Sequence, residues 1–129
     1  MAFEIPVLVD SRYRCAVASL AAHQFKFVKL TTNGIELCAA VTDKPWGVLQ
    51  NAPIIGENAE VMRVGVSKVK SGGTIAVSDA IGTDAAGLAA KKTLGTDLTH
   101  FVAGVADEAA VVTDILTVAI NCLNIGRAV

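Results

Sequence analysis

The clearest pattern of hydrophobic and polar positions lies between residues 25 and 41. Apolar residues recur at every second position from Ile35 to Val41, which is the period of a strand with one buried face. The Asn33-Gly34 pair just before this segment favours the positive φ angles of a tight hairpin turn. We therefore predict neighbouring antiparallel strands at Phe25–Leu30 and Ile35–Val41.

Three further segments have strand character. Val61–Lys70 is rich in valine, and its period slips near Arg63 and Gly65, which predicts a β-bulge. Leu116–Cys122 alternates cleanly between two faces, and Thr74–Val77 predicts a shorter strand. Each of these segments is short enough for a small sheet.

The connections complete the fold prediction. Gly82–Gly87 predicts a turn in which Asp84 bonds its own backbone two residues on and Gly87 takes a positive φ. Two Ala-rich stretches, 15–22 and 85–92, are alternatives for short helices. The fold class is therefore mainly β: a small single-domain β-barrel or β-sandwich with at most one or two short helices.

Composition changes the picture by adding surplus apolar surface. Hydrophobic residues make up 53% of the 129-residue chain and charged residues only 18%. A single small core does not readily absorb that much apolar surface, so self-association or burial against a larger partner is expected. The 11 basic and 12 acidic side chains are scattered and give a net charge of -1. Because a phosphate-tracking surface needs clustered basic residues, nucleic acid is not an expected partner.

Cysteine usage and hydropathy bear on the compartment. Cys15, Cys38 and Cys122 cannot all pair within one chain and lack C-x-x-C spacing, so we predict reduced, buried thiols and synthesis in a reducing cytoplasm. No apolar run approaches the roughly 18 residues of a membrane helix, and no membrane association is expected.

The motifs of catalysis and of cofactor binding are incomplete. His23 and His100 lack a second ligand at metal-binding spacing. A nucleophile elbow beginning at Gly65 fails because Val69 replaces its final glycine. The P-loop spacing of Gly82–Gly87 is not followed by the required lysine and hydroxyl residue. We therefore predict that the protein is not an enzyme and has no catalytic residues, no cofactor and no metal site.

A series of short motifs occurs in a set order from His23 onward. They are His23–Lys29, Lys44–Asn51, Gly56–Glu57, Val64–Val69, Gly82–Gly87 and Val118–Cys122. In order and spacing the series resembles the capsid decoration, or cement, proteins of tailed bacteriophages. The resemblance covers most of the chain from His23, and residues 1–22 match less well. It divides the chain into an N-terminal segment at 1–22, a candidate arm, and a β-rich decoration domain at 23–129.

The resemblance implies a structural virion protein that binds the outer surface of the phage head and stabilises the expanded shell. It implies the major capsid protein as partner and a homo-oligomer, with a trimer favoured and a dimer as the alternative. It implies neither catalysis nor a cofactor. From another class of protein, a small β-barrel module that binds a sugar or a peptide is the alternative function.

Seven residues are candidates for the capsid or subunit interface. The apolar N-terminal residues form either an arm that adds a strand to a neighbour's sheet or a first core strand. Trp46, the only tryptophan, is either a core residue or a binding anchor. The arginines are candidates for rim contacts with an acidic shell surface. The full set is Phe3, Ile5, Val7, Arg12, Arg14, Trp46 and Arg127.

Overall fold

The computed structural model describes residues 2 and 4–129, and its regular secondary structure consists of strands. The predicted β class is confirmed. Neither stretch proposed as an alternative helix is helical: 15–22 is largely loop, and 85–92 contains a strand. The strands are β1 (Ile5–Asp10), β2 (Phe27–Thr31), β3 (Gly34–Leu37), β4 (Gly47–Leu49), β5 (Val61–Lys70), β6 (Ala80–Thr83), β7 (Ala89–Lys91), β8 (Phe101–Val102), β9 (Gly104–Ala106), β10 (Ile115–Asn121) and β11 (Gly126–Arg127).

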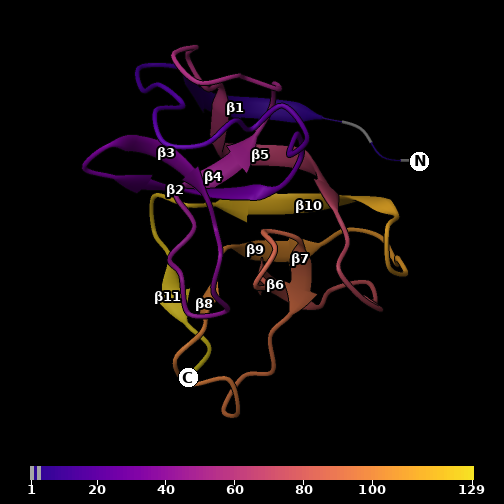
Figure 1. Cartoon of the computed structure of the whole chain (residues 1–129). Helices are drawn as coiled ribbons and strands as arrows, with labels where there is room; N and C mark the ends of the chain where they lie inside the picture. The colour runs from indigo at the N-terminus through magenta and orange to yellow at the C-terminus, as the bar shows by residue number, and fades with distance from the viewer. Residues whose placement is uncertain (1, 3) are drawn as a thin grey trace.

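Nine of these strands form one sheet in the order β3-β2-β4-β5-β10-β9-β6-β7, with β1 pairing separately with β5. All the pairings between these strands are antiparallel. Figure 1 shows β1, β5, β10 and β9 stacked one below another, and the sheet curls into an open half-barrel. The short strands β8 and β11 pair apart from the main sheet, at the end of the molecule opposite β1.

Strand β5 is the spine of the sheet. Met62 pairs with Val48 of β4 and with Val9 of β1, and Val64 pairs with Leu8 of β1 and Asn121 of β10. Since a strand has only two edges, β4 and β10 share one edge of β5, and β1 covers the other. The sequence prediction of Val61–Lys70 as a strand is confirmed residue for residue.

The predicted bulge is also present. Consecutive pairs join Leu8 to Val64 and Val9 to Met62, so Arg63 is an extra residue on β5. The valine pattern slips there because the bulge breaks the two-residue period. Gly65 has a φ of 140°, and a Cβ at that position would lie 2.5 Å from the Ile5 carbonyl oxygen. Only glycine fits this close approach of β1 to β5.

The hairpin prediction is confirmed, but the bounds of both strands are corrected. The first strand is Phe27–Thr31 and not Phe25–Leu30, because Phe25 has a positive φ of 64°. Thr31 pairs with Gly34 across a two-residue loop, and of the Asn33-Gly34 pair only Gly34 has the predicted positive φ, at 126°. The second strand ends at Leu37 and not at Val41. The Asp43 carboxylate accepts hydrogen bonds from the backbone N–H groups of residues 39 and 40 and so closes a turn in place of the last strand residues.

Two other local predictions have different outcomes. The Asp84 carboxylate accepts hydrogen bonds from Ala86 and Leu88, and Gly87 has a φ of 77°, so the predicted turn is confirmed. The short strand predicted at Thr74–Val77 is wrong, because only Ile75 forms a β-bridge there. The adjacent Gly72 and Gly73 and the turn around Ser78 interrupt the extended backbone.

The core consists of two clusters that meet along β5. The larger cluster includes Phe27, Val69, Leu116 and Val118, and the smaller one includes Val61 with residues of the first forty positions. Met62 belongs to the larger cluster and its neighbour Val61 to the smaller, so β5 is buried on both faces at its start.

Candidate binding surfaces

Strand β1 carries two of the predicted interface residues on an exposed edge of the sheet. Ile5 is 55% exposed and Val7 is 74% exposed, so neither belongs to the core. Phe3 lies outside the described residues. The structure thus pairs this segment with β5 of the same chain while leaving its apolar side chains open to a partner.

The backbone edge of β1 is irregular. Pro6 lacks an N–H group, and Val7 falls at a break in the register with β5. At the other ends of the sheet, the chain itself bridges β3 through Cys15 and β7 through Ser71. These features disfavour regular strand addition along β1, and the prediction of an arm that pairs with a neighbour's sheet stays a prediction.

A row of five uncharged residues crosses the outer face of the sheet. Successive pairings join one residue from each of the adjacent strands β1, β5, β10, β9 and β6. Directly paired residues project to the same face, and five strands about 4.8 Å apart span roughly 20 Å. Each member of the row is exposed or half-buried. The apolar row consists of Ile5, Val66, Ala119, Val105 and Ala80.

The next positions along the same strands confirm which face is outside. Ser67, Val118 and Ala106 pair across β5, β10 and β9, and all three are buried. Beside the apolar row lies a depression of about 300 Å³, lined by residues of β9 and β10 and by Val102, Ala103 and Asn124. The row and the depression share Val105 and Ala119, so together they form one continuous, uncharged and largely apolar surface.

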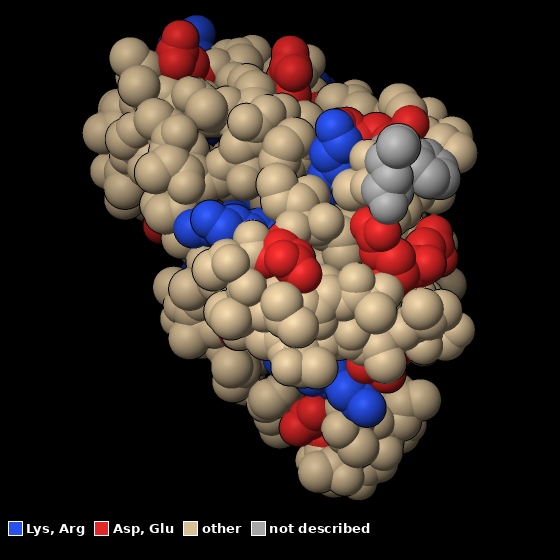
Figure 2. All heavy atoms as spheres, turned by 90° about the vertical axis from the view of Figure 1, so that its right-hand side faces the viewer, with Lys and Arg blue, Asp and Glu red and all other residues tan. Residues whose placement is uncertain are grey.

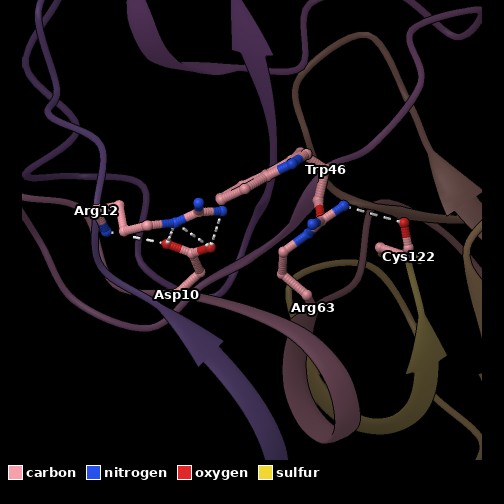
Figure 3. Close-up of polar contacts among 5 residues, drawn as sticks. All are labelled: Asp10, Arg12, Trp46, Arg63 and Cys122. Carbon is pink, nitrogen blue, oxygen red and sulfur yellow. Dashed lines mark hydrogen bonds and ion pairs between the residues drawn. The ribbon is translucent and has the colours of Figure 1, made fainter.

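Trp46 lies between the core and solvent. Its ring is half-buried, packs against the smaller core cluster and meets the ring of Tyr13 edge-on, with centroids 5.5 Å apart. The guanidinium of Arg63 lies over the Trp46 ring, 4.2 Å from its centroid (Figure 3). This is a cation–π contact at close range. The sequence left open whether Trp46 is a core residue or a surface anchor. In the structure it packs on the core and also lines a surface pocket.

The predicted arginines do not meet in one site. Arg12 pairs with Asp10 at 2.7 Å, and this hydrogen-bonded contact holds the pKa of the Asp10 carboxyl below its usual value (Figure 3). Arg14 is exposed, and its backbone forms an isolated β-bridge with Asn58. Arg127 is on β11, at the far end of the molecule from β1, with its guanidinium 5.5 Å from the Phe101 ring centroid.

The cysteines behave as the sequence predicts. All three are buried and unpaired, and burial raises the pKa of Cys38 and that of Cys122 to about 12. Each histidine has a ring nitrogen within hydrogen-bond distance of a lysine amine, at 3.0 Å for His23 with Lys26 and 3.1 Å for His100 with Lys92. Across residues 2 and 4–129, no group of three metal-ligating side chains occurs. The same residues include no helix with the length and apolar character that crossing a bilayer requires.

Charges are sparse on the side of the molecule shown in Figure 2, and both signs occur among a mostly uncharged surface. Ion pairs lie next to the apolar row at both ends: Lys68 with Glu4 at 3.5 Å, and Lys91 with Asp79 at 3.4 Å. These pairs leave the borders of the row close to neutral. The surface therefore suits contact with protein better than contact with a polyanion.

Sequence reasoning missed most of the residues on these surfaces. Val66, Ala119 and Val105 come from three strands that are far apart in the chain, and only strand register brings them into one row. The sequence pattern indicates Arg63 as a bulge position and not as a surface residue of a binding site. The signal that points to it is a charged residue within a valine-rich strand, next to an unusual slip of the period.

Comparison with known proteins identifies solved structures of the same fold. The chain matches a structure described as the crystal structure of head fiber gp8.5 N base in bacteriophage phi29, with a TM-score of 0.68 and 21% identity, over 89% of this chain and 96% of that chain. It also matches a chain of the capsid of Myoviridae phage XM1, with a TM-score of 0.61 and 16% identity, over 94% of this chain and 89% of that chain. Neither protein-family models nor curated proteins give a match to the sequence.

Proposed function

We propose that this chain is a structural protein of a tailed-phage virion that binds the phage head as a decoration protein. The observation that carries the proposal is the fold shared with the base of a phage head fibre, which extends over 96% of that chain. A phage capsid chain with the same fold supports it. The order of sequence motifs from His23 onward is an independent argument for the same class of protein.

The apolar surface suits such a role. The apolar row and its adjoining depression provide uncharged contact area on the outer face of the sheet, and Val105, which belongs to both, is 45% exposed. Many copies bound to one shell add their contacts, so modest affinity for each copy still reinforces the particle. In this proposal the protein acts by binding alone, without catalysis, cofactor, nucleic acid or membrane.

The finer features of the proposal come from the family resemblance. The partner is the major capsid protein, the site of binding is the outer surface of the expanded shell, and synthesis takes place in the host cytoplasm. The protein acts as a homo-oligomer, with a trimer favoured over a dimer. Interfaces of standard size would bury on the order of 800 Å² for each partner.

Binding to matched heads tests the proposal. Purified protein is mixed with expanded heads that lack it, and bound protein is measured by co-sedimentation. We expect saturation at a fixed ratio to shell subunits and a higher temperature of head disruption. Matched heads that take up no protein would contradict the proposal.

Sedimentation velocity tests the oligomer separately. We expect a trimer over the concentrations at which heads are saturated. A monomer both in solution and on the decorated particle would contradict the oligomer while leaving the decoration role in place.

A further inference from the structure

A second surface, separate from the apolar row, is a pocket of about 360 Å³ next to Trp46. Two cationic side chains line it, Arg63 from β5 and Lys44 from the segment before β4. The remaining lining residues are uncharged: Leu30, Pro45, Trp46, Cys122 and Leu123. A pocket with two positive charges and no acidic lining favours an anion.

Arg63 is held in place on several sides. Its Nε donates a hydrogen bond to the Trp46 carbonyl oxygen at 3.0 Å, and its Nη2 donates to the Cys122 carbonyl oxygen at 3.3 Å (Figure 3). The backbone N–H of Cys122 donates in turn to the Arg63 carbonyl at 2.8 Å. A guanidinium has five N–H donors, so three remain after these two hydrogen bonds. The side chain is therefore preorganised with donors to spare.

Neither cation forms an ion pair at contact distance with a carboxylate of the described residues. Lys44 instead has its amine 5.9 Å from the Phe101 ring centroid. Asp10 is the acidic residue drawn beside this cluster in Figure 3, and the positive charge of Arg63 contributes to lowering its pKa, but both of its carboxylate oxygens accept hydrogen bonds from Arg12. Arg63 therefore lies in the field of a carboxylate that is already hydrogen-bonded to Arg12, while its own remaining donors stay open to an anion.

We propose that this pocket binds the carboxylate of an aspartate or glutamate side chain that a protein partner presents next to an apolar residue. The planar donors of arginine match a carboxylate, and Lys44 adds a second positive charge. The exposed side chains of Leu30 and Leu123 provide apolar contacts at the rim for the neighbouring residue. The site goes beyond the proposed role on phage heads and does not depend on it.

Binding in the pocket can be followed through Trp46, which lines the pocket and is the only tryptophan of the chain. The probe is the blocked dipeptide acetyl-Leu-Glu-amide, and the control is acetyl-Leu-Gln-amide, which has the same shape without the charge. Both are titrated into the full-length protein while the single indole N–H signal is followed by NMR. We expect saturation by the glutamate peptide with a dissociation constant on the order of 1 mM, and at least tenfold weaker binding of the glutamine peptide.

Variants assign the effect to the pocket. Arg63→Gln is expected to weaken the glutamate peptide at least tenfold, and Lys44→Gln about threefold. Lys68→Gln is the matched control. Lys68 is on β5, like Arg63, and its amine lies near the ring of Phe25, but it does not line the pocket. That variant should bind as the parent does. Lys44 is exposed, so Lys44→Gln tests the pocket even if Arg63→Gln fails to fold.

Three results would overturn the proposal. The first is the lack of a saturable indole shift with the glutamate peptide up to 50-fold above the expected constant, on the order of 50 mM. The second is equal binding of the two peptides, and the third is an equal loss of binding in Lys44→Gln and Lys68→Gln. Because the assay contains no phage heads, these results are independent of whether the protein decorates them.

Discussion

The apolar row and the Trp46–Arg63 pocket both depend on β5, yet they have opposite character. Where β5 pairs regularly, Val66 lies in line with Ile5 and Ala119 and contributes to an uncharged row. Where β5 bulges, Arg63 leaves that alternation and packs against Trp46. One strand thus contributes to two surfaces because a single extra residue changes the direction of its side chains.

The difference separates two physical roles. Contact along the apolar row depends on the area removed from water and imposes little chemical selectivity. The pocket offers few contacts but discriminates by charge and by hydrogen-bond geometry. A partner that uses both surfaces gains affinity from the first and orientation from the second.

The largest expected effect comes from Gly65→Ala, which should detach β1 from β5 and so disrupt the apolar row. In Gly65→Ala the new Cβ meets the Ile5 carbonyl oxygen at 2.5 Å and the Val7 nitrogen at 2.9 Å, in a backbone conformation with φ of 140°. We expect a loss of about 3 kcal/mol in the free energy of unfolding, measured by denaturant titration. Hydrogen exchange should be faster in β1 than in β10.

Gly126→Ala is the control for this prediction. Its Cβ would meet no atom within 4 Å, so its effect on unfolding should stay within about 0.5 kcal/mol. Equal stability of the two variants would contradict the close approach of β1 to β5.

A charge in the apolar row should separate binding from folding. Val105→Asp places a carboxylate within the row, between Ala119 and Ala80, where an interface would leave it desolvated and unpaired. We expect about 100-fold weaker binding to matched heads, which corresponds to about 2.7 kcal/mol. Thermal stability should change little, because the side chain is exposed in the free protein.

Val17→Asp is the matched variant, since Val17 lies in a loop outside the row and is 49% exposed. It should bind heads as the parent protein does. Similar losses in both variants would show that general surface charge, rather than the row, governs binding.

Removing Arg63 from the pocket should lower stability less than Gly65→Ala does. Arg63→Ala loses the stacking on Trp46 and two hydrogen bonds to backbone carbonyls. We expect a loss of about 1.5 kcal/mol in the free energy of unfolding and a shift in Trp46 fluorescence. Arg63→Lys should recover part of the stability but not the hydrogen bond geometry. An unchanged fluorescence spectrum in Arg63→Ala would contradict the contact.

The smallest expected effect is a pH dependence of folding stability that arises from Asp10. The hydrogen bond from Arg12 lowers the pKa of Asp10 in the folded state. The resulting stabilisation is full above the unfolded pKa of about 3.9 and is lost as the pH falls through the lower folded pKa. Asp10→Asn should therefore be less stable than the parent at pH 6, and this difference should disappear in strong acid. The exposed Asp107→Asn serves as control and should follow the parent curve.

Local parts of the fold were predictable because their causes are local. The turn at Asn33-Gly34 and the hydrogen bonds of Asp84 involve residues within a few positions of each other. The slip of the valine pattern predicted the bulge of β5 for the same reason. The end of the second hairpin strand was missed because Asp43, outside the alternating segment, competes for its backbone N–H groups.

The candidate surfaces were less predictable. Of the apolar row, sequence reasoning singled out Ile5 alone, because an exposed valine and a buried valine look the same in a sequence. Trp46 was identified as a candidate anchor, but its partner Arg63 is 17 residues away and reaches it through the pairing of β4 with β5.

The sequence by itself determined that the chain forms short strands with tight turns and has apolar residues in excess of what one small core absorbs. It also determined where β5 departs from a regular strand. Only the tertiary structure decided which apolar residues stay outside and which cations form no ion pair. The physical reason is that exposure and pairing are properties of strand register, which aligns residues from distant parts of the chain.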